Sequence, residues 1–102
     1  MSRLRLSLAM MLGINTAWAA DAPALLEKYQ CYICHADHQA KAGPAYDAVA
    51  ERYRGDPNAA AKLIAIVRKG AFRGGPWHMP PHPEVSRAQA ARMVQYILLL
   101  KN

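Results

Sequence analysis

The apolar residues near the C-terminus recur with the spacing of an amphipathic helix. Five of them follow the i, i+3, i+4, i+7, i+8 pattern of one helix face: Ala90, Met93, Val94, Ile97 and Leu98. Ser86 with Gln89 three residues later is typical of a capping box, so a helix is predicted to begin directly after Ser86. This helix is expected to present its apolar face to the core.

Two helices are predicted in the part of the chain that precedes residue 54. Asp21 is a candidate N-cap, and Pro23 is tolerated in the first turn of a helix that runs to Tyr29. The pair Gly43-Pro44 interrupts the chain before a second short helix at 45–53.

A third helix is predicted to begin at Pro57 and to continue through 59–69. Asp56 is its expected N-cap, Pro57 its first residue and Gly70 its stop. The segment 70–83 is rich in Gly and Pro and is predicted to be an ordered loop. Because the alternating pattern of strands is absent, the predicted fold class is all-α, with about four short helices.

The N-terminus has the pattern of an export signal. Arg3 and Arg5 precede the apolar stretch 6–14, and Ala17-Trp18-Ala19 fits a signal-peptidase site. A membrane anchor or a buried helix is the alternative, but the apolar stretch is shorter than the roughly 20 residues that span a bilayer. We therefore expect residues 1–19 to be a cleaved signal peptide and 20–102 to form one exported domain, without a membrane span.

Size and charge limit the function further. A chain of 102 residues holds one domain at most, which excludes a dinucleotide-binding domain, a TIM barrel or a two-domain enzyme. Its 13 basic and 7 acidic residues give a net charge of +6, which falls to +4 when Arg3 and Arg5 leave with the signal peptide. With one Phe, five Tyr and two Trp, so small a core often needs a bound group to complete it.

The most specific chemical signal is the C-x-x-C-H motif formed by Cys31, Cys34 and His35. This motif is typical of covalent haem attachment. Residues three apart lie on the same side of a helical turn, so both thiols can reach the two vinyl groups of a haem while His35 points at the iron.

Three other interpretations of the motif are weaker. A redox dithiol belongs in a βαβ setting, and a zinc site needs further thiolates that the chain lacks. A structural disulfide would leave His35 without a role. The sequence therefore predicts one covalently attached haem c, bound through thioethers at Cys31 and Cys34, with His35 as an axial iron ligand.

The second axial ligand is predicted to be Met79. Met93 lies on the apolar face of the last helix and is assigned to packing, whereas Met79 lies in a loop stiffened by prolines. His38, His78, His82 or an open site are the alternatives. Ligation by Met and His is the arrangement that raises the potential of cytochromes c.

The mature sequence resembles the short bacterial class I cytochromes c over essentially its whole length. The resemblance depends on four segments: 31–35, Gly43-Pro44-Ala45-Tyr46, Val67-Arg68-Lys69-Gly70 and Met79-Pro80-Pro81. It implies that the carbonyl of Pro44 accepts a hydrogen bond from the ring of His35. The sequence departs from the family at Gln30, where a Gly is common, and at Trp77, which is nearer to the Met than the family's loop tryptophan.

The resemblance implies a soluble, periplasmic electron carrier that cycles between Fe(II) and Fe(III) and is not an enzyme. The positive charge favours redox partners with acidic docking faces. Nucleic acid is an unlikely ligand class because no basic cluster is interleaved with aromatic residues. A dedicated subunit of a periplasmic oxidoreductase, or a gas-binding or peroxidatic haem protein, remains the alternative.

Overall fold

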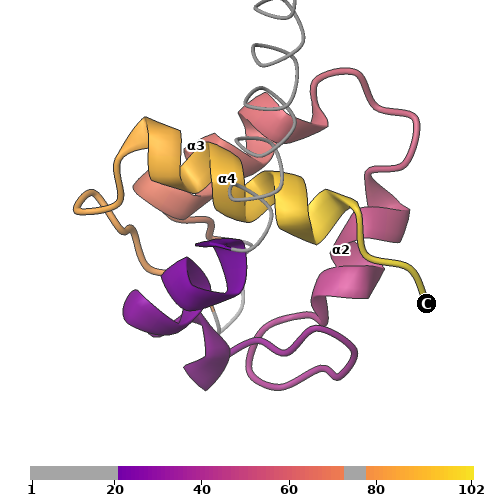
Figure 1. Cartoon of the computed structure of the whole chain (residues 1–102), viewed down its shortest axis with the longest axis horizontal. Helices are drawn as coiled ribbons and strands as arrows, with labels where there is room; N and C mark the ends of the chain where they lie inside the picture. Colours follow the sequence, from indigo (N-terminus) through magenta and orange to yellow (C-terminus); the bar gives the residue numbers. More distant parts are fainter. Residues whose placement is uncertain (1–20, 73–77) are drawn as a thin grey trace, which may run out of the picture.

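Helices account for the regular structure of the described residues, which are 21–72 and 78–102 in this computed structural model (Figure 1). Residues 21–28 are helical, and a short 3₁₀ helix, η2 (Cys31–Ile33), follows them. Three α-helices complete the fold: α2 (Tyr46–Arg52), α3 (Ala59–Lys69) and α4 (Arg87–Leu98). Within the described ranges the only bridge between extended segments joins Ala71 to Met79, so the prediction of an all-α fold is confirmed.

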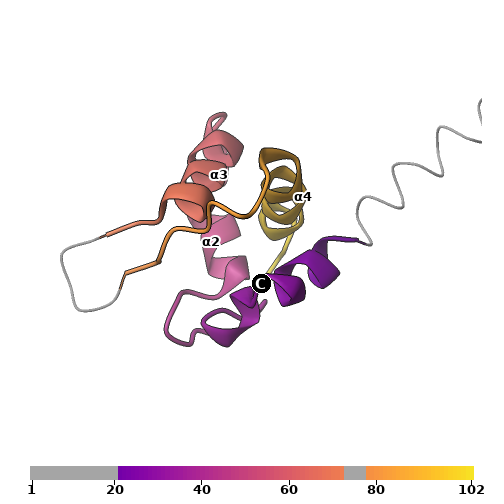
Figure 2. The same ribbon diagram turned by 90° about the vertical axis from the view of Figure 1, so that its left-hand side faces the viewer.

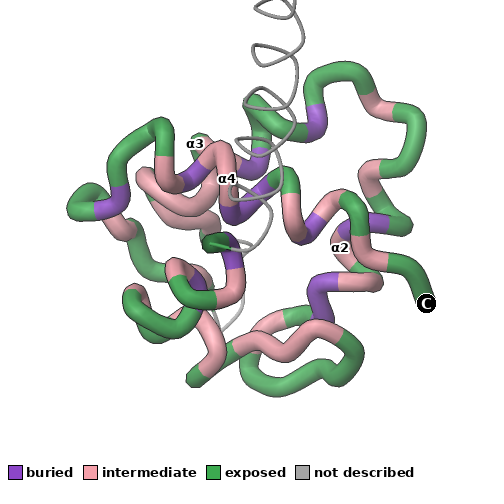
Figure 3. The backbone as a smooth tube through the Cα atoms, viewed as in Figure 1, coloured by how far each residue is buried: buried purple, intermediate pink, exposed green. Residues whose placement is uncertain are grey.

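Helix α4 packs against both α2 and α3, and the latter lies beside it in Figure 2. The core cluster joins the first helical segment, the start of α2, the turn before α4 and α4 itself: Leu26, Tyr46, Val85, Ala90, Met93 and Ile97. Figure 3 marks buried positions along α2, α3 and α4. The predicted apolar face of α4 is therefore confirmed, with Leu98 half-buried at its end.

One of the two hydrogen bonds of the predicted capping box is present at the start of α4. The Ser86 hydroxyl oxygen accepts a hydrogen bond from the backbone N–H of Gln89 at 3.1 Å. The side chain of Gln89 does something else, because its Oε1 accepts a hydrogen bond from the Tyr29 hydroxyl at 2.6 Å. The residue expected to close the cap instead joins the N-terminal helical segment to α4.

The predicted start of α3 is wrong by two residues. Asn58, and not Asp56, is the N-cap, and the helix begins at Ala59. The carboxylate of Asp56 accepts from the backbone N–H of Asn58 at 2.8 Å and from Lys62 Nζ at 2.7 Å. Asp56 thus stabilises the turn before α3, a conformation that its short polar side chain favours.

The other predicted helix limits agree with the structure to within one residue, apart from the first N-cap. Helix α2 is capped by Ala45 and Tyr53, and α3 ends at Gly70. Asp21 is already helical and is not an N-cap. Of the described helices, none is long and apolar enough to cross a membrane. The predicted signal peptide 1–19 and Trp77 lie outside the described residues.

Gln30 has a left-handed backbone, with φ 60° and ψ 26°, at the junction between the first helical segment and η2. This conformation brings the Cβ of an L-residue close to the next carbonyl oxygen, whereas Gly adopts it freely. The structure therefore explains why a Gly is favoured at this position in the family that the sequence resembles.

Gln30→Gly is expected to raise the free energy of unfolding of the haem-loaded protein by about 1 kcal/mol, because it removes the left-handed penalty. Denaturant titration would measure the change. Gln39→Gly is the matched control, since Gln39 is exposed and does not have a positive φ. An equal or larger gain from Gln39→Gly would contradict the explanation.

Candidate functional site

The C-x-x-C-H segment forms one tight turn. The backbone N–H groups of Cys34 and His35 both donate to the carbonyl oxygen of Cys31, at 3.2 and 3.0 Å. Both cysteines are free thiols; Cys34 is exposed and Cys31 is half-buried. The turn predicted from the spacing is present, and both thiols are available for covalent attachment.

His35 is fixed by a hydrogen bond to the segment that precedes α2. Its Nδ1 lies 2.7 Å from the carbonyl oxygen of Pro44. A carbonyl oxygen only accepts, so Nδ1 carries the proton and Nε2 keeps its lone pair. The contact that the resemblance implied for Pro44 is therefore present, and it leaves Nε2 as the nitrogen able to bind a metal.

Two further residues hold the His35 ring. The Tyr46 ring stacks on it, with centroids 4.8 Å apart and planes inclined by 17°. Gly43 lies so close that an added Cβ would be 2.4 Å from Cε1 of the imidazole. A side chain at residue 43 would displace the ring. This steric limit explains why a glycine precedes Pro44.

Tyr46 also contacts the first cysteine. Burial raises the pKa of the Cys31 thiol, and a hydrogen bond with the Tyr46 side chain partly offsets this rise. The pKa of Tyr46 is itself raised well above its ordinary value, mainly because the side chain is buried. Tyr46 ends the Gly43-Pro44-Ala45-Tyr46 segment, and no sequence pattern indicates this contact with Cys31.

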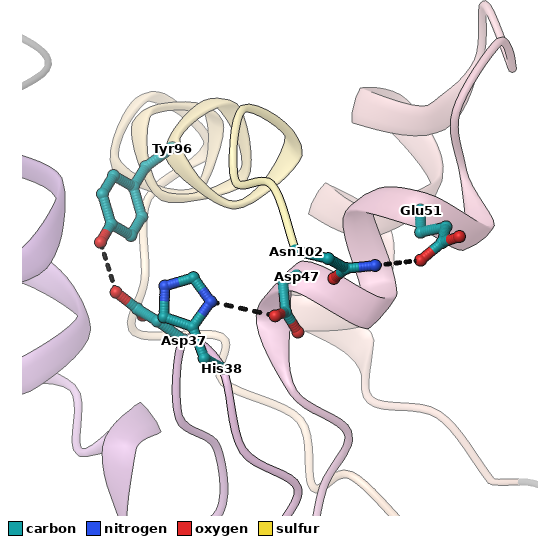
Figure 4. Close-up of polar contacts among 6 residues, drawn as sticks. All are labelled: Asp37, His38, Asp47, Glu51, Tyr96 and Asn102. Atoms are coloured by element: carbon teal, nitrogen blue, oxygen red, sulfur yellow. Dashed lines mark hydrogen bonds and ion pairs between the residues drawn. The ribbon is translucent and has the colours of Figure 1, made fainter.

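A carboxylate braces the motif against α4. Asp37 accepts hydrogen bonds from the hydroxyls of Tyr32 at 3.0 Å and Tyr96 at 2.5 Å, and Figure 4 shows the contact with Tyr96. Burial is the main cause of the raised pKa of Tyr32, and the hydrogen bond to Asp37 is the second. For Tyr96 the hydrogen bond to Asp37 is the main cause of the raised pKa. Sequence reasoning missed this brace.

Met79 belongs to a second segment, which the end of α3 holds in place. Met79 and Ala71 exchange two backbone hydrogen bonds, at 3.0 and 2.9 Å. The backbone N–H of His82 donates to the carbonyl oxygen of Val67 at 3.0 Å. Gly70, with φ 80°, leaves no room for a Cβ, which would lie 2.7 Å from the Met79 carbonyl oxygen.

The competing methionine and histidines have other environments. Met93 is 1% exposed within the core, as predicted. His38 pairs with Asp47 at 2.9 Å (Figure 4), and His82 pairs with Glu84 at 3.0 Å. His78 is exposed, and its ring lies 5.7 Å from that of Phe72. Two of the three histidines, His38 and His82, therefore have a carboxylate partner.

Comparisons with known proteins show the family of this chain. Residues 19–101 match the family model "Cytochrome c". The chain is 37% identical over 89 residues to cytochrome c2 of Rhodocyclus tenuis, covering 80% of this chain and 95% of that protein. It is 36% identical over 87 residues to cytochrome c-551 of Pseudomonas aeruginosa, covering 83% of this chain and 82% of that protein.

A solved structure shows the same fold. The crystal structure of wild-type Nitrosomonas europaea cytochrome c552 superposes with a TM-score of 0.71 at 33% identity, covering 78% of this chain and 99% of that one. The family implies a covalently bound haem c and electron transfer without enzymatic turnover. The chain therefore belongs to the cytochrome c family, as a small bacterial class I electron carrier.

Proposed function

We propose that Cys31 and Cys34 attach one haem c through thioethers and that His35 and Met79 are its axial ligands. The observation that carries the proposal is the His35 ring, whose Nδ1 is occupied by Pro44 while Nε2 is free, directly after two free thiols on one turn. When bound, the haem iron supplies the one-electron Fe(II)/Fe(III) couple.

Pro44 tunes His35 in this proposal. A carbonyl oxygen that accepts the Nδ1 proton increases the electron density of the imidazole and fixes its tautomer. A more basic imidazole favours the ferric state, and the thioether of Met79 favours the ferrous state. The reduction potential is set by the balance of the two.

Ligation by both residues also explains why the protein carries electrons and does not convert a substrate. A side chain at each axial position leaves none for an exogenous ligand. Met79 is half-buried and its backbone is hydrogen-bonded to Ala71, so contacts of the protein backbone fix the position of the ligand segment.

The proposal is tested on the full chain, produced in a host that attaches haem c. We expect a pyridine haemochrome spectrum of two thioethers, a reversible one-electron redox titration and no rapid binding of CO to the reduced protein. Rapid CO binding by the wild type would refute ligation by Met79, and a protein without covalent haem would refute the site as a whole.

Gly70→Ala is expected to weaken the bond from Met79 to iron, because the new Cβ would meet the Met79 carbonyl oxygen at 2.7 Å and Pro81 N at 2.9 Å. The far-red absorption of the oxidised protein, which the cytochrome c resemblance associates with a sulfur ligand, would measure this. Gly55→Ala is the control, since Gly55 has φ 82° with nothing within 4 Å of the added Cβ. Both variants place a Cβ at a positive φ, so equal spectra in the two would contradict the role of Gly70.

We also propose that the protein works in the periplasm after removal of residues 1–19. The basic start, the apolar stretch and the Ala17-Trp18-Ala19 site support this. The mature N-terminus is then expected to be Ala20. An intact mass that contains residues 1–19 together with haem would refute the cleavage.

For the redox partners we propose acidic docking faces. Arg68, Lys69 and Arg87 line a groove between α3 and α4, and the mature chain has a net charge of +4 before the haem propionates are counted. Opposite charges steer an encounter, and salt screens this steering. Electron exchange with ferricyanide should therefore slow as ionic strength rises, and exchange with a cationic ruthenium complex should accelerate; the reverse pattern would contradict the proposal.

A further inference from the structure

Tyr46 contacts three residues of the haem-binding segment at once. Its ring stacks on the His35 imidazole and meets the Tyr32 ring edge-on, with centroids 6.1 Å apart. The Tyr46 side chain and the Cys31 thiol are also neighbours, since each affects the pKa of the other. One side chain therefore touches both a proposed attachment point and a proposed iron ligand.

The position of Tyr46 is fixed by the backbone and by burial. It is the first residue of α2, and its backbone N–H donates to the carbonyl oxygen of Ala36 at 2.9 Å. The next residue, Asp47, makes an equivalent bond to Asp37 at 2.9 Å. The start of α2 is thus tied to the residues directly after His35, and the Tyr46 side chain is 5% exposed.

A group held this firmly can orient its neighbours. Stacking restricts rotation of an aromatic ring, and a hydrogen bond limits the direction of a thiol. The Pro44 carbonyl oxygen fixes one ring nitrogen of His35 but leaves the plane free to turn about that bond. The Tyr46 ring supplies the restraint that this hydrogen bond lacks.

We propose that Tyr46 is a positioning residue that sets the orientation of the His35 imidazole and of the Cys31 sulfur together. This inference rests on the proposed haem site. Two separable effects follow from it: the hydroxyl favours thioether formation at Cys31, and the ring determines the plane of the axial imidazole.

Two substitutions separate the effects in the haem-loaded full chain. Tyr46→Phe keeps the ring and removes the hydroxyl, and Tyr46→Met keeps a similar apolar volume without a ring. Tyr53→Phe and Tyr53→Met are the matched controls, because Tyr53 is the half-buried C-cap residue of the same helix. Mass spectrometry and haemochrome spectra count thioethers, and the paramagnetic haem methyl shifts of the oxidised protein report the imidazole plane.

We expect Tyr46→Phe to accumulate several-fold more product that lacks the Cys31 thioether than Tyr53→Phe does, with unchanged methyl shifts. Tyr46→Met is expected to change the order or spread of the methyl shifts, whereas Tyr53→Met leaves them as in the wild type. Attachment in Tyr46→Phe equal to that in Tyr53→Phe would overturn the role of the hydroxyl.

Wild-type methyl shifts in Tyr46→Met would overturn the role of the ring. If Tyr46→Met does not accumulate, Tyr46→Phe still tests the role of the hydroxyl. The role of the ring is then tested with Tyr46→Trp, which changes the stacked ring, by the same methyl shifts. Failure of the proposed function is distinguishable, because the wild type itself would then lack covalent haem or the signature of two axial ligands.

Discussion

Met79→Ala is expected to lower the reduction potential and to abolish the far-red charge-transfer band that the family resemblance implies for a sulfur ligand. A thioether is a soft, neutral donor that stabilises ferrous iron, so its loss favours the ferric state. The open position would bind water or the neighbouring His78, and CO would bind the reduced protein readily. Redox titration, the oxidised spectrum and CO addition measure these three effects.

Met93→Leu is the control for this substitution. Met93 is 1% exposed in the core, and a swap that conserves volume should cost less than about 1.5 kcal/mol without changing the spectrum. Retention of the far-red band in Met79→Ala together with its loss in Met93→Leu would reverse the ligand assignment.

Replacing either cysteine of the motif should have the largest effect on the yield of holoprotein. In Cys31→Ala or Cys34→Ala, one thioether is lost, and the haem no longer cross-links the turn at both points. Because a domain this small buries little surface without its cofactor, we expect little stable holoprotein to accumulate. The amount of covalent haem per chain, measured as pyridine haemochrome, gives the result.

Ile33→Ala provides the matched control for the cysteine variants. Ile33 lies between the two cysteines and is 67% exposed, so its truncation removes little packing and neither thiol. Its holoprotein yield should be close to that of the wild type. A haemochrome spectrum of two intact thioethers in either cysteine variant would contradict the proposed attachment.

Local patterns predicted the parts of the fold that local interactions determine. The apolar spacing of α4 and the stop of α3 at Gly70 depend on a few consecutive residues, and the structure confirms both. The prediction for Asp56 was wrong because a short acidic side chain can cap a turn as well as a helix. A pattern within four residues does not distinguish the two outcomes.

The contacts around the motif could not be predicted in the same way. Asp37 joins Tyr32 to Tyr96, which is 59 residues further along the chain, and no spacing rule relates such positions. The sequence pattern indicates that Gly43 and Gly70 interrupt helices, but each also leaves space for a neighbouring group. Such steric roles depend on which segments meet, and this is known only from the fold.

The hydrogen bonds of the Tyr29 and Tyr96 hydroxyls join residues that are far apart in the sequence. This separation affects the order in which the parts of the fold form. Each joins the first third of the described chain to α4, across 60 and 59 residues. Contacts so distant in sequence form late, because a long loop must close before they stabilise anything. During synthesis the cysteine turn also emerges long before the helix that braces it, because it lies nearer to the N-terminus. We expect a chain that ends before α4 to present both thiols on an unbraced segment, so the C-terminal helix determines when the attachment segment acquires its final shape.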